Sequence, residues 1–312
     1  MLTVSNYHYI RDDFSARYPS IFGITPDAFR NQLSALKNMG SFISPHALAD
    51  NAEEVLLSDK NFILITFDDG LKEQYQFAVP ILKSLQLQAL FFINSINHIE
   101  KKISQVHKIH LLRSVVSSKE LYADLVAFAK IDLADSDKEK AQHFYRFDDK
   151  SSAEVKYLLN VILPTAVQKE FIDLKFRQEF DENQVLENLY MSEDEIKSLA
   201  KNGQIGSHTH SHIPLGIQPE EIMYSELHTS KNYLEQLCQV PLHSVSYPYG
   251  SGNAVSEKVA AIAKETGYKL GFTTLPGNNT SGSNPLLLNR FDTNDLPGGK
   301  NEIMGSVNSE AK

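Results

Sequence analysis

The 312-residue sequence has a single cysteine, Cys238, so it cannot form an internal disulfide bond. This lack is in keeping with a reducing compartment, where disulfides are rare. Cys238 follows an amphipathic segment, and nothing around it indicates a nucleophile. We interpret it as a packing residue.

The sequence also lacks a dense cluster of Lys and Arg residues. The 30 Lys and Arg residues are outnumbered by 39 Asp and Glu residues, which gives a formal net charge of −9. Proteins that bind a nucleic-acid backbone carry a dense basic patch or stripe. We therefore expect no nucleic-acid partner.

The sequence has no apolar run long enough to span a bilayer. Residues 1–9 lack the basic start and the long apolar core of a signal peptide. We therefore expect no membrane span, and cytoplasmic residence is the expected localisation. The sequence does not determine the oligomeric state.

Short apolar segments alternate with amphipathic ones in two parts of the chain. Each apolar segment predicts a buried strand, and each amphipathic segment predicts a helix. Strands that alternate with helices imply a parallel sheet with right-handed crossovers. The strands are predicted near residues 2–9, 42–43, 61–67, 88–94, 204–207, 244–246, 269–274 and 286–291.

The alternation is interrupted between about residues 96 and 190. This stretch has helical periodicity and almost no strand signal, and we interpret it as a helical insertion in a single domain that spans residues 1–312. It contains one acidic pair, Asp148-Asp149, followed by Lys150-Ser151. The pair predicts a helix cap rather than a second metal site.

Two adjacent carboxylates, Asp68 and Asp69, follow a strongly apolar predicted strand and precede Gly70. An Asx-Gly turn after a strand is common, and it is one interpretation of this stretch. Neighbouring carboxylates repel each other unless a cation or a shared proton offsets the charge. The alternative is therefore a metal ligand or an acid–base pair, at the end of the sheet where α/β folds bind ligands.

Three of the 11 histidines fall within residues 208–212, directly after another predicted strand. Clustered histidines at a strand end favour metal binding. Two histidines and one carboxylate form an open site typical of a zinc hydrolase, and the second carboxylate is then free to act as a base. His210 is a third ligand, a supporting residue or a solvent-facing one, and we favour the last two.

Two motifs and a following tripeptide resemble those of a known family. Thr66-Phe67-Asp68-Asp69-Gly70 and His208-Thr209-His210-Ser211-His212, with Pro248-Tyr249-Gly250 after them, resemble motifs of the NodB-homology polysaccharide deacetylases, carbohydrate esterase family four. The resemblance covers about residues 1–95 and 190–295. It implies an α/β fold, a distorted (β/α) barrel that here carries the helical insertion.

The resemblance also implies an activity and residue roles. The family hydrolyses N-acetyl, and sometimes O-acetyl, groups on sugars, so the expected partner is an N-acetylated sugar or polysaccharide precursor. The cofactor is a divalent metal, Zn²⁺ in the first place, with Co²⁺, Ni²⁺ or Mn²⁺ as alternatives. Asp69, His208 and His212 are the implied ligands, and Asp68 is the implied catalytic base. Tyr249 would supply a backbone N–H to the oxyanion and a ring to the sugar pocket.

The chain departs from the family pattern at two points. The arginine that usually orients the base is replaced by Ser246, and Arg290 is either its substitute or an ordinary surface arginine. The late histidine that usually serves as general acid is missing from its motif, which leaves the acid unassigned. His8 ends the first predicted strand, and we favour a core histidine there over a site role.

Three functions are in keeping with these residues. The first is a metal-dependent deacetylase of a sugar or polysaccharide precursor. The second is a related metal-dependent hydrolase of a non-sugar amide, for which the two departures leave room. The third is a catalytically inactive carbohydrate-binding homologue, against which the intact Asp-Asp pair and histidine motif argue.

Overall fold

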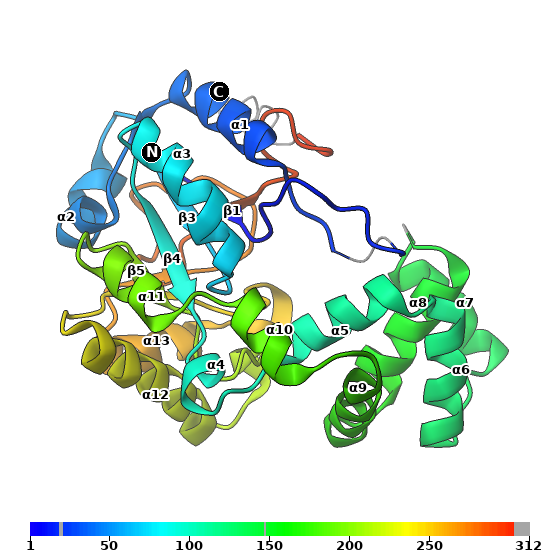
Figure 1. Cartoon of the computed structure of the whole chain (residues 1–312). Helices are drawn as coiled ribbons and strands as arrows, with labels where there is room; N and C mark the ends of the chain where they lie inside the picture. Colours follow the sequence, from blue (N-terminus) through cyan, green and yellow to red (C-terminus); the bar gives the residue numbers. More distant parts are fainter. Residues whose placement is uncertain (19–20, 147, 303–312) are drawn as a thin grey trace. The chain divides into compact units, whose positions relative to one another are not determined.

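The computed structural model describes residues 1–18, 21–146 and 148–302. The chain divides into two units, drawn in Figure 1. Unit 1 comprises Met1–Asp13, Gly23–Lys102 and Leu186–Lys312, and unit 2 comprises Phe14–Phe22 and Ile103–Val185. None of the described helices combines the length and the apolar character that crossing a membrane requires.

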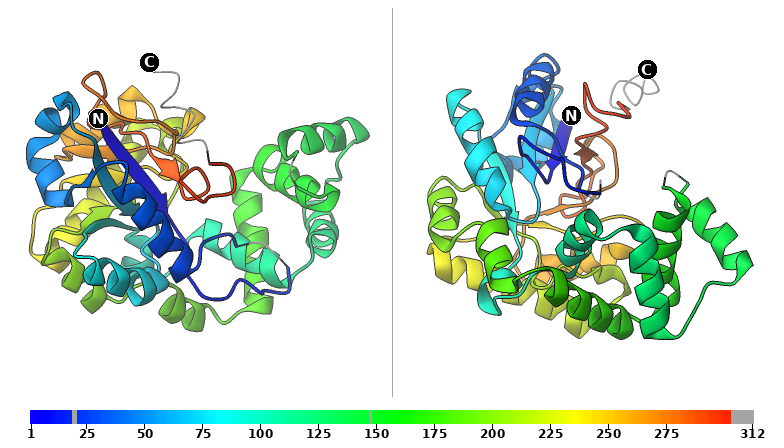
Figure 2. Two further views of the ribbon diagram at one scale, coloured as in Figure 1. Left: turned by 90° about the horizontal axis from the view of Figure 1, so that it is seen from above. Right: turned by 45° about the vertical axis from the view of Figure 1, so that its right-hand side comes forward.

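Unit 1 is built on an eight-stranded sheet whose strand pairs are all parallel. The strand order is β7-β6-β5-β4-β3-β1-β8, with β2 paired to β3. The sheet curls into a half-barrel with helices around it, which confirms the predicted barrel fold (Figure 2). The strands are β1 (Leu2–Tyr7), β2 (Ser41–Phe42), β3 (Phe62–Phe67), β4 (Ala89–Ile93), β5 (Ile205–Ser207), β6 (Ser244–Ser246), β7 (Leu270–Phe272) and β8 (Phe291–Asp292).

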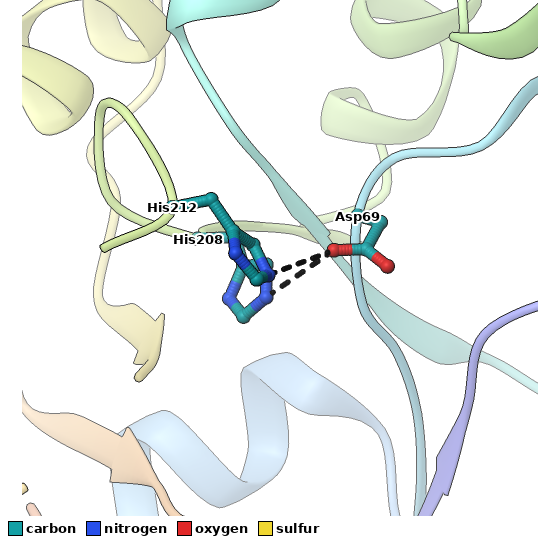
Figure 3. A group of neighbouring side chains, drawn as sticks. All are labelled: Asp69, His208 and His212. Carbon is teal, nitrogen blue, oxygen red and sulfur yellow. Dashed lines mark ion pairs between the residues drawn. The ribbon is translucent and has the colours of Figure 1, made fainter. Parts of the chain in front are cut away.

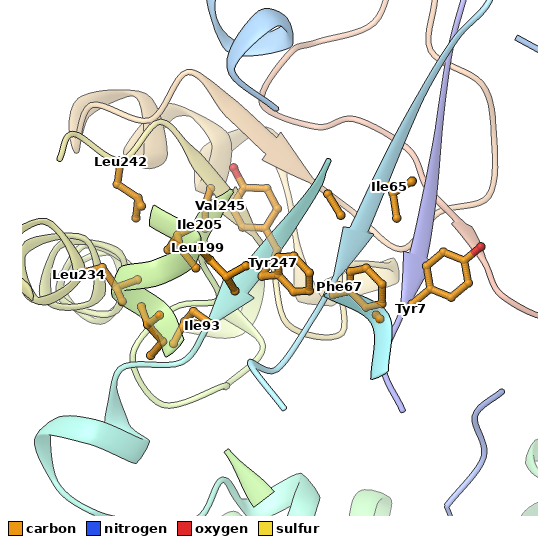
Figure 4. Close-up of a cluster of buried hydrophobic side chains, with 14 of the residues drawn as sticks. Tyr7, Ile65, Phe67, Ile93, Leu199, Ile205, Leu234, Leu242, Val245 and Tyr247 are labelled. Carbon is orange, nitrogen blue, oxygen red and sulfur yellow. The ribbon is translucent and has the colours of Figure 1, made fainter. Parts of the chain in front are cut away.

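The central strands are buried on both faces, and this explains their nearly continuous apolar sequences. Successive side chains of a strand point to opposite faces. In β3, Ile65 and Phe67 therefore join one core cluster, and Leu64 joins another. Phe67 stacks on Phe91 of β4 with ring centroids 4.8 Å apart. Figure 4 shows the first of these clusters, which continues to Tyr7 of β1.

The helices of unit 1 begin where the sequence places capping residues. The Thr25 hydroxyl accepts a hydrogen bond from Ala28 N at the start of α1, and Ser192 and Glu195 form the predicted capping box of α11. These helices are α1 (Pro26–Lys37), α2 (Pro45–Leu57), α3 (Val79–Ser84), α4 (Ile96–Ile99), α11 (Glu193–Ala200), α12 (Glu220–Cys238) and α13 (Glu257–Glu265). A π-helical turn, Gln74–Ala78, precedes α3, and 3₁₀ turns occupy Leu215–Ile217 and Gly252–Ala254.

Among the described residues of unit 2, the regular elements are all helical, and the described part of Phe14–Phe22 forms no helix or strand. Asp149 accepts a hydrogen bond from Ser152 N at the start of α8, which confirms that the acidic pair belongs to a helix cap. Unit 2 also takes in Phe14–Phe22, which the sequence pattern did not link to the insertion, and the single-domain assignment stays a prediction. The helices are α5 (Gln105–Val115), α6 (Ser118–Ala129), α7 (Asp135–Phe144), α8 (Lys150–Tyr157) with the π turn Leu158–Ile162, α9 (Thr165–Glu179) and α10 (Glu182–Leu189), whose last residues belong to unit 1.

Candidate metal centre and catalytic site

Three parallel strands of unit 1 lead into polar residues. β3 leads into Asp68-Asp69, β5 leads into His208, and β6 leads into the turn at Tyr249. The carboxyl ends of parallel strands meet at one edge of a sheet, and this edge is where barrels place their sites. The strand order therefore gathers residues that lie far apart in the sequence.

The carboxylate of Asp69 faces two imidazoles. Its Oδ1 lies 3.5 Å from Nε2 of His208 and 3.3 Å from Nε2 of His212. Figure 3 draws the three side chains and marks these two ion pairs with dashed lines. One ligand atom from each of the three residues lies within 4.8 Å of the others. The two imidazole rings are nearly perpendicular, with centroids 4.9 Å apart. The three side chains thus converge on one point from two strand ends.

This donor set fits a divalent cation such as Zn²⁺, which takes imidazole nitrogen and carboxylate oxygen. Nδ1 of His208 lies 2.8 Å from the backbone oxygen of Ser246, so it carries the proton and donates. The lone pair of Nε2 is then directed toward Asp69. Burial, as the largest effect, lowers the pKa of His208 to about 4, and the ring is neutral near pH 7. A neutral imidazole is the form that binds a metal.

Residues 208–212, which we call the ligand loop, hold an unusual backbone. Thr209 has φ = 62° and His212 has φ = 59°, both in the left-handed region. Such residues cost of order 1–3 kcal/mol each and persist only where the surroundings fix them. Strained backbone of this kind gathers at functional sites, and Asp69 shares it with φ = 78°.

Asp68 points its carboxylate at Arg290 instead of at the metal centre. Nη1 and Nη2 of Arg290 donate to Oδ1 and Oδ2 of Asp68 at 2.8 and 2.7 Å. Burial by itself would favour the neutral acid, but Arg290 and then His208 hold the pKa of Asp68 well below its usual range. The Asp68 carboxylate is therefore ionised near neutral pH.

Arg290 is only 1% exposed, so it is not a surface arginine. Its guanidinium also donates to Ser246 Oγ at 2.9 Å. Ser246 stands at the position where the family pattern has its arginine. Arg290 is the residue before β8, not near the end of a strand over 286–291 as predicted, and from there it reaches Asp68 and bonds the serine that replaces the usual residue. The remaining acceptors of its N–H groups are Thr273 O at 2.7 Å, Asn6 Oδ1 at 3.0 Å and Thr66 Oγ1 at 3.2 Å.

Sequence reasoning missed Asn6 and Ser246 as parts of this network. Asn6 of β1 lies opposite Thr66 of β3 in the sheet register, and both are buried. A polar residue in a buried strand needs a hydrogen-bond partner. Polar residues inside otherwise apolar strands were the signal that could have identified the network.

The comparisons with known proteins agree with this geometry. The sequence model of the polysaccharide deacetylase family matches residues 58–118 and 138–271, which is more than half of the chain. The chain belongs to the polysaccharide deacetylase family. The resemblance predicted from the motifs is therefore confirmed.

Individual relatives of the family are distant from this member. YxkH of Bacillus subtilis (strain 168) is 34% identical over 90 residues, which cover 28% of this chain and only 31% of YxkH. The Streptococcus pyogenes deacetylase PplD, solved in complex with acetate, is 19% identical with a TM-score of 0.60, over 98% of this chain and 97% of PplD. IcaB from Ammonifex degensii is 18% identical with a TM-score of 0.55, over 93% and 90% of the two chains. At these identities the solved structures show a shared fold.

His8 of this family member lies at the site. Its side chain is 35% exposed, and its Nε2 lies 3.9 Å from Asp68 Oδ2, so the interpretation as a core histidine is wrong. Nε2 of Gln74 donates to the backbone oxygens of His8 and Asp68, at 2.9 and 2.6 Å. The physical reason for the error is that His8 follows the last residue of β1, where the strand leaves the sheet.

Tyr249 lies in the turn after β6, with φ = 60° and a side chain that is half exposed. Its ring meets the His212 ring edge-on, with centroids 5.2 Å apart. Thr274 fixes the turn, because its hydroxyl donates to Tyr249 O at 3.0 Å and its N–H donates to Gly250 O at 2.9 Å. The turn therefore presents Tyr249 beside the histidines.

His210 is outside the three-residue ligand group of the described chain. Its Nδ1 lies 2.8 Å from Ser95 Oγ, and its Nε2 lies 2.9 Å from Glu100 Oε1. This serine–histidine–carboxylate row links the ligand loop to the residues that follow β4. The row restrains the ligand loop, so His210 is a supporting residue, and its side chain is 17% exposed.

Proposed function

We propose that this chain is a metal-dependent hydrolase that removes N-acetyl or O-acetyl groups from a sugar or polysaccharide precursor. One observation carries the proposal: Asp69, His208 and His212 converge at the sheet edge where Arg290 holds an ionised Asp68. Two imidazoles and a carboxylate beside a free base are the parts that hydrolysis of an unactivated acyl group requires. Family membership supports the same chemistry.

Asp69, His208 and His212 would hold the cation, which we propose to be Zn²⁺, with Co²⁺, Ni²⁺ or Mn²⁺ as alternatives. When bound, such a cation lowers the pKa of water and polarises an acyl carbonyl. The protein keeps the ligands ready for it, because the Ser246 carbonyl fixes the tautomer of His208.

Asp68 takes the proton of the attacking water in this proposal. Each oxygen of the carboxylate accepts one hydrogen bond from Arg290 and keeps a second lone pair for that proton. Arg290 also fixes the orientation of the carboxylate, since two parallel hydrogen bonds restrain its rotation. The backbone N–H of Tyr249 donates to the oxyanion that develops on the acyl group, and its ring lines the sugar pocket.

His8 is our proposal for the unassigned general acid. It lies 3.9 Å from Asp68 and is partly open to solvent, so the imidazole can be reprotonated after each turnover. An imidazolium at this place would donate its proton to the departing nitrogen or oxygen of the sugar. With His8 as the acid, the chain needs no histidine in the late motif, because His8 at the end of the first strand replaces it.

Acetyl groups are favoured over other acyl groups by the likeness to PplD, whose structure is described as a complex with acetate. The proposed partner is a sugar or polysaccharide precursor. A non-sugar amide is the alternative substrate. An inactive carbohydrate-binding homologue is disfavoured, since all four motif side chains and an arginine for the base are kept together.

The test measures acetate release from N-acetylglucosamine oligomers, O-acetylated sugars and a panel of non-sugar amides. The protein is first stripped of metal with a chelator and then reloaded with Zn²⁺ or Co²⁺. We expect release from an acetylated sugar only after reloading, and its loss in Asp68→Asn with metal still bound. The matched control is Asp59→Asn, an exposed aspartate of unit 1, which should behave like wild type. Undiminished release by the metal-free protein would contradict the proposal.

A further inference from the structure

The two ends of the ligand loop are held in different ways. The first part bonds to the end of β4 and to the residues that follow it. His208 N donates to Ile93 O at 2.8 Å, and Ile96 N donates to His210 O at 3.0 Å. These backbone bonds are joined by two bonds that involve side chains, from Asn94 Nδ2 to His208 O and from Thr209 N to Ser207 Oγ. They fix His208, the first of the two histidine ligands, as an extension of the sheet.

The second part of the loop is held by a side chain. Glu226 of α12 is buried, and both of its carboxylate oxygens accept hydrogen bonds from Ser211. Ser211 N donates to Oε2 at 2.8 Å, and the Ser211 hydroxyl donates to Oε1. Ser211 immediately precedes His212. A buried carboxylate bonded twice to one residue is a strong and directional restraint.

His212 needs such a restraint, because its backbone is left-handed. At φ = 59° it is less stable than in an extended conformation, and it persists only where its surroundings fix it. A change of φ at His212 rotates its side chain about the backbone and carries Nε2 away from Asp69. The bonds from Ser211 to Glu226 fix the peptide just before this rotation axis.

We propose that Glu226 is a positioning residue for the metal centre: through Ser211 it holds His212 in the ligand conformation. The inference rests on the proposed function, in which His212 binds a metal. Glu226 is 14 positions beyond His212 and lies on the next helix, so it touches neither the cation nor the substrate in this scheme. Its removal weakens metal binding because the free protein then has to recover the strained conformation of His212 on binding.

The experiment measures the Zn²⁺ affinity of the metal-free protein by competition with a chromogenic chelator. Glu226→Ala should weaken the affinity by about 10- to 100-fold, the usual range for residues that orient metal ligands. Glu226→Gln should be intermediate, since an amide oxygen still accepts from Ser211 N and the amide N–H donates to the Ser211 hydroxyl. Ser211→Ala should lose one of the two bonds. The matched control is Glu221→Gln, an exposed glutamate of the same helix, which should bind Zn²⁺ like wild type.

Thermal unfolding of each metal-free variant separates positioning from stability. A merely structural Glu226 would lower the unfolding temperature and leave the Zn²⁺ dissociation constant within about twofold of wild type, and that result overturns the inference. Wild-type protein that binds no Zn²⁺ refutes the proposed function instead. If Glu226→Ala fails to fold, Glu226→Gln and Ser211→Ala decide by the same measurement: unchanged affinity in both overturns the proposal, and weakened affinity supports it.

Discussion

Both units of this protein bury charged side chains, but they do so in different ways. In unit 2, Nζ of Lys108 lies 2.7 Å from Asp173 and 2.5 Å from Glu182, and those carboxylates are 24% and 37% exposed. In unit 1, the side chains of Arg290 and Asp68 are only 0% and 2% exposed. The buried Lys108 is therefore paired with carboxylates that are partly hydrated, whereas Arg290 and Asp68 are paired with each other and with the polar groups around them.

The difference shows that a buried charge by itself is weak evidence of function. Lys175 of unit 2 is nearly buried and lies 2.7 Å from Asp124, with Glu120 and Glu179 within 4 Å. These carboxylates are 35–57% exposed, and none belongs to the metal-ligand group found among the described residues. Asp68 lies next to Asp69, which belongs to the one group with metal-ligand geometry found among the described residues. Convergence of several polar groups at one sheet edge is what distinguishes the site.

The largest effect is expected from His212→Ala, which removes one of the three proposed ligands. Acetate release should fall to the background rate, and metal content measured by mass spectrometry should fall with it. Asp173→Ala in unit 2 is the control, and it should leave metal content unchanged. Full metal content in His212→Ala would contradict the proposal that Asp69, His208 and His212 bind the metal.

His8→Asn tests whether a half-exposed group of unit 1 takes part in the chemistry. We expect kcat to fall by about 10²- to 10⁴-fold, the usual contribution of a general acid, with metal content unchanged. An unchanged kcat in His8→Asn would leave the proton donor unassigned again.

Arg290→Met tests how much a buried ion pair contributes to stability, for comparison with the partly exposed pairs of unit 2. It leaves Asp68 as an unpaired buried charge, which typically costs about 3–5 kcal/mol of unfolding free energy, measured by urea denaturation. The double variant Asp68→Asn, Arg290→Met should recover much of this loss, because it removes both charges. A single variant as stable as wild type would show that solvent reaches the pair.

Lys108→Met is the corresponding change in unit 2. The freed carboxylates of Asp173 and Glu182 are partly hydrated, so we expect a loss of only about 1–2 kcal/mol. Its partners described above all belong to unit 2, so Zn²⁺ affinity should stay at the wild-type value. A loss as large as that of Arg290→Met would remove the distinction between the two kinds of pair.

The smallest effect is expected from Glu100→Gln, which weakens the bond from Glu100 to His210 on the exposed side of the ligand loop. Exposed ion pairs contribute about 0–1 kcal/mol, so Zn²⁺ affinity should change by less than about fivefold. The same titration that is applied to Glu226 checks it. If Glu100→Gln loses more Zn²⁺ affinity than Glu226→Gln, the main restraint on the ligand loop comes from the residues after α4 and not from α12.

The sequence by itself determined the barrel and the four motif side chains. Alternating apolar strands and amphipathic helices are local patterns, and they imply a parallel sheet whose strand ends gather the polar residues. Asp68 and Asp69 are adjacent, and His208 and His212 are four positions apart, so each pair is recognisable within one short segment. The family assignment followed from these segments.

Only the tertiary structure decided how those residues are held. Arg290 lies 222 positions from Asp68, and no local pattern joins them; the strand order β3-β1-β8 brings the two segments to the same sheet edge. His8 was misjudged as a core residue, because exposure at a strand end depends on what covers that end. Glu226 and Ser211 meet because α12 packs beside β5. Sequence patterns report a residue's own secondary structure, whereas hydrogen bonds between distant segments depend on where the fold places them.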